Sequence, residues 1–200
     1  MINKIKNSLA TLFMFSKLRT FCMTYGRKVP NSIKKALLFF AMAIISFFMR
    51  AIARIPKKSC RIYALKYLAE HSYKKGHLEK ARAQAFELLE LAPEFQDGCL
   101  NGNAIHDSNI ILGKVCLREG NVEAAKEHLL KAAHTPGSPQ LNSFGPNMAL
   151  ANELLSLGEQ EVIIEYFKLC GKFWKSGKLF EWAEVIKAGG TPNFRGNLNY

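Results

Sequence analysis

The chain has 200 residues and a formal net charge of +12, and the excess of positive charge is confined to one end. Residues 1–69 carry 14 Lys and Arg and no acidic residue, whereas residues 70–200 carry 14 Lys and Arg and all 16 acidic residues. This division excludes one globular domain with an evenly basic surface, and an apolar content of 48% excludes a wholly disordered chain. Five cysteines without a close pair exclude a disulfide framework and a C-x-x-C zinc site.

The first helical pattern, residues 2–13, is apolar on one face, and basic residues are interleaved with it up to Arg19. This pattern predicts an amphipathic helix at an anionic membrane surface. An organellar transit peptide is basic and acid-poor in the same way, and a basic arm for nucleic acid is a further alternative. The clusters of Phe, Leu, Ile and Met favour the membrane over nucleic acid, because such clusters aggregate in water.

Residues 36–49 form an uncharged apolar run that is apolar on all faces. As a helix it covers about 21 Å, short of the roughly 30 Å hydrocarbon core, but weakly apolar flanks extend it to residues 33–55. The basic residues near its ends would then snorkel to the headgroups, which predicts a single-pass membrane anchor, with a buried or partner-bound helix as the alternative. Pro56 ends this helix. We therefore divide the chain into a basic N-terminal region, residues 1–58, and a helical domain, residues 59–200.

Charge and cysteine usage both bear on the side of the membrane on which the helical domain lies. Eight basic residues precede the apolar run within residues 1–35, and six follow it within residues 50–66, so the positive-inside rule does not decide the orientation. Unpaired cysteines favour a reducing compartment, which predicts a cytoplasmic helical domain.

From residue 60 onward, helical patterns are separated by Gly and Pro without strand-like alternation, which predicts an all-α domain. Three segments look alike, residues 75–81, 119–125 and 157–163, and each has a glycine in second position that suits the left-handed end of a helix. They predict three helical hairpins. Residues 178–188 predict a capping helix that buries Leu179, Trp182, Val185 and Ile186, followed by a tail from which Phe194, Leu198 and Tyr200 fold back onto the domain.

Around these turns the sequence resembles the tetratricopeptide repeat, a helix-turn-helix unit of 34 residues. The first two units, residues 62–95 and 106–139, place small residues where paired helices approach most closely, and the third, residues 144–177, matches less well. The first two turn glycines are 44 residues apart, so we expect an inserted loop, Glu94–Asn103. The matching residues are Leu68, Ala69, Ala81 and Pro93 in the first unit, Leu112, Gly113, Gly120, Ala125, Ala132 and Pro136 in the second, and Leu150, Ala151, Gly158 and Phe167 in the third.

The resemblance implies a short α-solenoid that binds a peptide or protein on a concave surface lined by the first helices of its units. We therefore expect a membrane-anchored scaffold or adaptor rather than an enzyme, with no cofactor or metal and no nucleic-acid partner. Because the helical part is slightly acidic, no polyanionic ligand is expected on it. The candidate binding residues, chosen by one-face helical spacing, are Tyr63, Lys66, Glu70, Tyr73, Asp107, Ile110, Lys114 and Leu117.

Two alternatives stay open. The first is a soluble enzyme of unknown reaction that uses His106 and Cys99, although His106 and Asp107 are better explained as the start of a helix. The second is a basic-tailed nucleic-acid binder. The long connection at residues 135–147 is expected to be an ordered connector with Leu141 and Phe144 in the core, or else a binding loop.

Overall fold

The computed structural model describes residues 58–95 and 99–198, and the predicted anchor, residues 33–55, lies outside this part. Every regular element in the described residues is helical, which confirms the all-α prediction. The elements are α3 (Lys58–Lys74), α4 (Leu78–Leu91), η1 (Ala92–Phe95), α5 (Cys99–Arg118), α6 (Val122–Ala133), α7 (Pro139–Phe144), α8 (Ala149–Ser156), α9 (Gln160–Cys170), α10 (Lys178–Lys187) and η2 (Arg195–Leu198).

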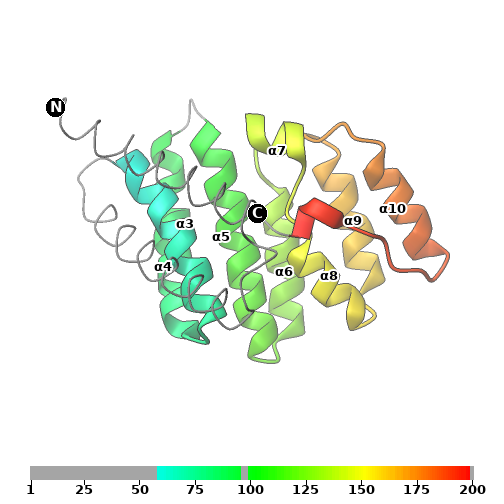
Figure 1. The fold of residues 1–200 in the computed structure, drawn as a ribbon, viewed down its shortest axis with the longest axis horizontal. Helices are drawn as coiled ribbons and strands as arrows, with labels where there is room; N and C mark the ends of the chain where they lie inside the picture. Colours follow the sequence, from blue (N-terminus) through cyan, green and yellow to red (C-terminus); the bar gives the residue numbers. More distant parts are fainter. Residues whose placement is uncertain (1–57, 96–98, 199–200) are drawn as a thin grey trace, which may run out of the picture. The chain divides into compact units, whose positions relative to one another are not determined.

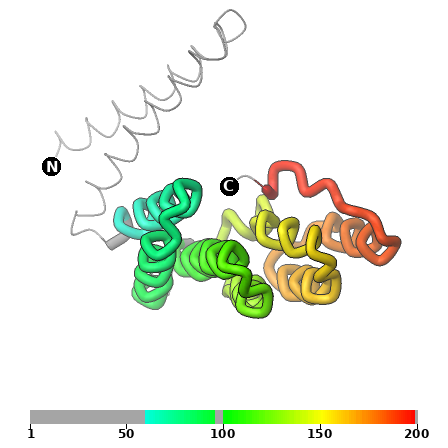
Figure 2. Tube along the Cα trace, turned by 90° about the horizontal axis from the view of Figure 1, so that it is seen from below, coloured from blue at the N-terminus to red at the C-terminus, as the bar shows by residue number. Residues whose placement is uncertain are grey.

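Successive helices within this part pack as neighbours (Figures 1 and 2). α3 packs against α4, α4 against α5 and α5 against α6, while α9 contacts α6, α8 and α10. The short helix α7 lies against α5. Because tight turns join α3 to α4, α5 to α6 and α8 to α9, these pairs form helical hairpins.

The three predicted hairpin turns are present and use the same hydrogen bonds. Their glycines, Gly76, Gly120 and Gly158, have φ values of 79°, 80° and 88°, a region that other residues rarely adopt. In each turn the residue after the glycine donates its N–H to a carbonyl five residues earlier, as in a Schellman motif. The bonds run from His77 to Ser72, from Asn121 to Cys116 and from Glu159 to Leu154, with N···O distances of 2.9, 2.9 and 3.2 Å.

The small residues expected at close helix contacts are buried there. Ala69, Ala81 and Ala125 are 0% exposed. A Cβ atom added to Gly113 would lie 2.3 Å from Cδ2 of Leu150, closer than two carbon atoms can approach. The sequence prediction of tight packing at these positions is confirmed.

The inserted loop predicted at Glu94–Asn103 is wrong. η1 covers its start, and α5 begins at Cys99, so residues 99–103 are helical and His106 lies in the middle of a helix rather than at its start. The N-terminal part of α5 is stabilised because Ala104 packs with Leu88 and Ala92 in a small core formed by α3, α4, η1 and α5. The insertion therefore lengthens a helix.

The connection at residues 135–147 contains α7, whose start is set by local chemistry. Ser138 accepts the N–H of Leu141 at 3.0 Å, and Pro139 occupies the first helical position, where its missing N–H costs nothing. Leu141 is buried as expected, but Phe144 is 69% exposed. The prediction that Phe144 lies in the core is wrong, because Phe144 faces the groove described below.

The predicted capping helix is α10, with one difference. Leu179, Trp182 and Ile186 are buried, whereas Val185 is 40% exposed on the outer side. The tail folds back, since the ring of Phe194 lies 5.0 Å from that of Trp182, centroid to centroid. Leu198 packs against the same core, and Tyr200 lies outside the described residues.

Asn197, in η2 of the C-terminal tail, forms hydrogen bonds to the connection before α8. Its side-chain Nδ2 donates to the carbonyl oxygens of Phe144 and Pro146 at 3.0 and 3.1 Å, and its own carbonyl accepts the N–H of Met148 at 2.7 Å. Three hydrogen bonds thus hold residues 144–148 and η2 together. This contact forms one wall of the groove.

Candidate functional site

A groove of about 750 Å³ opens between α3, α5, α7 and η2. Two large aromatic side chains that line it, Tyr63 and Phe144, are 54% and 69% exposed. Volumes of this size are typical of ligand sites, which combine apolar walls with a few polar groups. The apolar walls here are Ile62 of α3, Leu88 of α4, Leu100 and Ala104 of α5, and Leu141 of α7.

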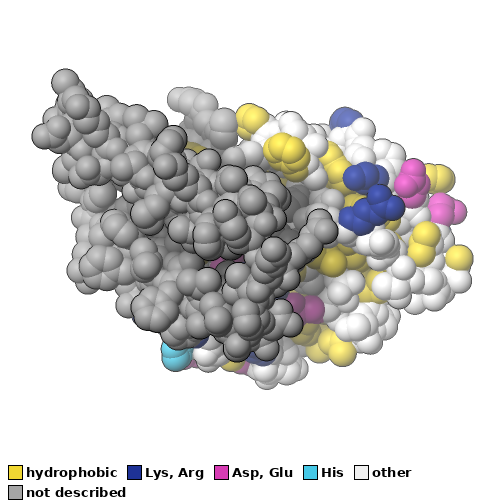
Figure 3. All heavy atoms as spheres, viewed as in Figure 1, with side chains coloured by type: hydrophobic (Ala, Val, Ile, Leu, Met, Phe, Trp, Pro, Cys, Tyr) yellow, Lys and Arg dark blue, Asp and Glu magenta, His cyan; other side chains and the backbone are white. Residues whose placement is uncertain are grey.

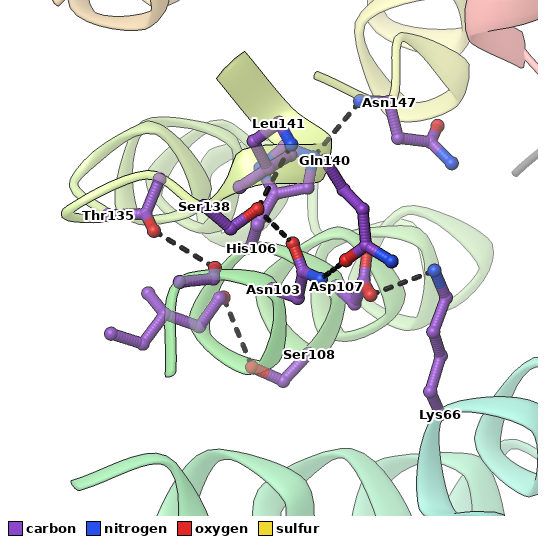
Figure 4. Close-up of polar contacts among 12 residues, drawn as sticks. Lys66, Asn103, His106, Asp107, Ser108, Thr135, Ser138, Gln140, Leu141 and Asn147 are labelled. Carbon is purple, nitrogen blue, oxygen red and sulfur yellow. Dashed lines mark hydrogen bonds and ion pairs between the residues drawn. The ribbon is translucent and has the colours of Figure 1, made fainter. Parts of the chain in front are cut away.

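An ion pair between Lys66 of α3 and Asp107 of α5 lies in the groove, with 2.8 Å between Nζ and Oδ2 (Figure 4). The Asp107 side chain is 11% exposed and that of Lys66 is 31% exposed. Burial lowers the pKa of Lys66, but the attraction of Asp107 and then of Glu70 outweighs it, so the pKa is raised overall and the ammonium stays charged. The pair links two helices and offers charged hydrogen-bonding atoms in apolar surroundings.

Two side-chain amides lie beside this ion pair. Ser138 donates from Oγ to Oδ1 of Asn103 at 2.6 Å, and Nδ2 of Asn103 donates to Oε1 of Gln140. Asn103 stands one helical turn before Asp107, so the amides and the ion pair follow one another along α5 (Figure 4). The Nε2 group of Gln140 makes no hydrogen bond within the described residues and remains available as a donor.

His106, on the same helix, is fully buried, and its ring makes contacts that hold the fold together. Its Nδ1 lies 3.0 Å from the carbonyl of Ala132, which can only accept, so Nδ1 carries the proton. Its Nε2 accepts the N–H of Asn147 at 3.0 Å. Both ring nitrogens are therefore occupied by backbone groups, and the ring joins α5 to the end of α6 and to the segment before α8.

Burial lowers the pKa of His106, and burial followed by the charge of Lys131 lowers the pKa of His128. Below pH 6.5, the ordinary pKa of histidine, these two imidazoles bind protons more readily in the unfolded chain than in the folded chain. We therefore expect folding stability to be greatest above this value and to fall as the pH is lowered from 6.5 toward about 5, because protons then bind the unfolded chain preferentially. Urea denaturation across this range measures the effect.

The double change His106→Gln and His128→Gln is the control for this pH dependence. Glutamine does not titrate, so the variant should lose most of the stability change between pH 6.5 and about 5, a window above the ordinary carboxyl pKa values. A urea midpoint that is constant over this window in the unchanged chain would contradict the prediction.

The structure brings three of the eight predicted binding residues, Tyr63, Lys66 and Asp107, to the groove. Ile110 is 4% exposed and belongs to the core, so it is not available to a partner. Leu117 is partly buried against the same core. The remaining three, Glu70, Tyr73 and Lys114, are half-buried and do not line the groove.

Tyr73 and Lys114 belong to a structural contact between α3 and α5. The Lys114 ammonium and the Arg118 guanidinium lie 4.9 and 4.3 Å from the centre of the Tyr73 ring, as in cation–π interactions. Arg118 also donates to the carbonyl of Tyr73 at 2.9 Å, and Lys114 pairs with Glu153 at 3.2 Å. These groups already have partners within the fold.

Sequence reasoning missed most of the groove. Leu100 and Asn103 were assigned to the inserted loop, although the 44-residue spacing of the turn glycines did mark the place where the chain adds them. The unusual connection at residues 135–147 was noticed, and it supplies Gln140 and Phe144. Nothing in the pattern indicated that residues 195–197 would reach the same place, since that contact spans more than 50 residues of sequence.

Comparison with protein-family models, curated proteins and solved structures finds no match. The resemblance to the tetratricopeptide repeat therefore rests on the sequence pattern alone. In the described part of the chain, no group of three or more His, Cys, Asp or Glu side chains is placed to hold a metal ion. The same part has no helix with the length and apolar character needed to cross a bilayer.

Proposed function

We propose that this chain is a membrane-anchored interaction protein that binds a peptide segment of a partner protein in the groove between α3, α5 and α7. The observation that carries the proposal is the groove itself, in which two exposed aromatic rings, an apolar wall and the Gln140 amide group meet. Interfaces draw most of their binding energy from such aromatic anchors in partly enclosed pockets.

The resemblance of the sequence to the tetratricopeptide repeat supports a peptide as the partner. Three hairpins end their first helices with the same glycine turn and the same hydrogen bond, which is the behaviour of a repeated unit. In the family that the sequence resembles, the first helices of successive units line the binding surface. α3 and α5 are the first helices of the first two hairpins, and both contribute residues to the groove.

Changing an exposed aromatic residue of the groove should weaken binding without unfolding the domain. The full-length chain is used to select binders from a displayed library of random 12-residue peptides. We expect Tyr63→Ala and Phe144→Ala each to weaken the selected peptides about tenfold or more, because aromatic anchors often contribute 2 kcal/mol or more. Fluorescence anisotropy of labelled peptides measures the affinities.

Phe180→Ala is the matched control, because Phe180 is 70% exposed on α10 and does not line the groove. It should leave the affinities unchanged. Selected peptides that bind all three variants and the unchanged chain equally well would contradict a binding site in the groove.

The proposed anchor, residues 33–55, contains an uncharged apolar run at residues 36–49 with lysines or arginines on both sides. We expect the full-length chain to stay with membranes after an alkaline wash, and a chain lacking residues 33–55 to be released, because a spanning segment is held by burial of apolar surface rather than by charge. Release of the full-length chain would contradict a spanning anchor. The unpaired cysteines favour a helical domain on the cytoplasmic side.

A further inference from the structure

The groove carries a local excess of positive charge that the total charge of the helical part conceals. Lys66, Lys178 and Arg195 line it, and Asp107, which is paired with Lys66, supplies the one carboxylate among its described lining residues. A second hollow of about 480 Å³ shares Phe144 and Lys178 with the groove. The described residues that it adds include one more cation and no carboxylate: Asn142, Ser143, Trp174, Lys175 and Ser176.

Three of these cations have no carboxylate partner within the described residues. Among the described residues, Lys178 and Arg195 form side-chain-mediated hydrogen bonds only through their backbone N–H groups, and Nζ of Lys175 donates to the carbonyl of Gly171 at 2.7 Å. Dark blue side chains gather on this face between the 195–198 segment and α10, close to the hydrophobic side chains over α7 (Figure 3). Unpaired like charges raise the electrostatic energy of the free protein, and an anionic ligand would lower it.

The backbone of Arg195 adds an independent observation. Its φ is +47°, in the left-handed region of backbone conformation. Few residues other than Gly, Asn and Asp adopt this conformation readily. The conformation is held by a hydrogen bond from the Arg195 N–H to Oδ1 of Asn193 at 3.1 Å and by the bonds of Asn197 to the connection before α8. Backbone strain of this kind is found preferentially at functional positions.

We propose that the groove binds an acidic peptide segment, in which a carboxylate side chain follows an apolar one. This inference rests on the proposed function and specifies the chemistry of the partner. The apolar residue packs between Tyr63, Leu100 and Phe144, and the carboxylate lies toward Lys178 and Arg195, with Lys175 beyond them. Charge-assisted hydrogen bonds to these cations make the acidic group part of the recognition and not only of the first encounter.

The middle of the groove favours a peptide over a hydrocarbon chain or RNA. A hydrocarbon chain would cover the Gln140 amide and the Lys66–Asp107 pair without hydrogen bonds, and buried polar groups that lose their partners are costly. A peptide backbone supplies a donor and an acceptor at each residue for these groups. RNA would place charged phosphates against Ile62, Leu88 and Leu100, where the described cation nearest in the chain, Lys66, is already paired with Asp107.

Two substitutions remove the proposed charge contacts with little risk to the fold. Lys178 is the first residue of α10, where Lys178→Glu places a carboxylate at the positive end of the helix dipole. Arg195→Asn removes the charge and suits the left-handed backbone. Lys80→Glu is the control, because Lys80 is exposed on α4 and lines neither hollow.

The experiment selects peptides from the random 12-residue library with the full-length chain and measures their affinities for the combined Lys178→Glu and Arg195→Asn variant and for Lys80→Glu. We expect Asp and Glu to be enriched beside apolar residues in the selected peptides. We also expect about tenfold weaker binding to the combined Lys178→Glu and Arg195→Asn variant, unchanged binding to Lys80→Glu, and the same loss when the peptide acid is replaced by its amide.

The possible negative results distinguish the acidic-peptide inference from the proposed peptide-binding function. Peptides that need Tyr63 and Phe144 but show neither acid enrichment nor sensitivity to the charge variants would overturn this inference and leave the proposed function standing. The absence of any peptide that depends on the groove would overturn both. If the charge variants abolish binding of a 20-nucleotide poly(U) RNA and leave peptide binding unchanged, the cations serve nucleic acid and the inference is wrong.

Discussion

Replacing His106 by alanine should lower the free energy of unfolding by about 3–5 kcal/mol. The imidazole is fully buried, so the change leaves a cavity, and it removes the two hydrogen bonds that the ring makes with the Ala132 carbonyl and the Asn147 N–H. Deleting a large buried side chain costs about 2–5 kcal/mol, and each buried polar group left unsatisfied adds about 1–3 kcal/mol, partly offset by relaxation. Urea denaturation followed by circular dichroism measures the loss.

His106→Phe separates the two causes of this loss, because phenylalanine restores most of the volume and neither hydrogen bond. We expect it to remain destabilising, by about 2 kcal/mol or more. His134→Ala is the control, since His134 is exposed at the end of α6 and should change stability by less than about 0.5 kcal/mol. Equal, small effects at both positions would contradict the structural role of His106.

The second large effect is expected at Gly102, where alanine should destabilise the domain by about 2–4 kcal/mol. A Cβ atom there would lie 1.9 Å from the carbonyl oxygen and 2.6 Å from the carbonyl carbon of Gly137. The turn cannot move away freely, because Thr135 donates to the carbonyl of Gly102 at 2.9 Å. Overpacking costs about 1–3 kcal/mol when side chains can adjust, and a backbone obstacle costs more.

Asn101→Ala is a sharp control because it introduces the same residue one position earlier in the same helix. Helix propensity alone favours alanine at both positions, by about 1 kcal/mol over glycine and somewhat less over asparagine. The Oδ1 atom of Asn101 is buried without a hydrogen-bond partner, so its removal should be neutral or stabilising. If Gly102→Ala also stabilises the domain, the contact between α5 and the 135–138 turn is wrong.

The hairpins were predictable because local sequence determines them. A glycine between two apolar helical patterns indicates that the first helix ends there with a residue in the left-handed conformation. The turns at Gly76, Gly120 and Gly158 all follow this rule. The small residues at helix contacts were also predictable, because close packing excludes larger side chains there. These features depend on neighbours within a few residues of sequence.

The groove was harder to predict because distant segments form it. The start of α5 contains three poor helix formers, Asn101, Gly102 and Asn103, and the sequence therefore predicts a loop there. It is helical because it packs against α4 and passes close to the backbone of Gly137. The sequence predicts His106 at the start of a helix, and it does not show that Ala132 and Asn147 converge on its ring. Long-range contacts therefore override local preferences where the site lies.

The central claim is that a peptide occupies the groove between α3, α5 and α7, and hydrogen exchange of the full-length chain tests it most directly. With a saturating library-selected peptide, backbone amides should become more protected in residues 62–66, 99–107, 139–145 and 194–198, which border the groove. Phe144→Ala should reduce this protection at the same peptide concentration. Protection confined to α6 and α9, or to residues 1–57, with these four segments unchanged, would contradict the account.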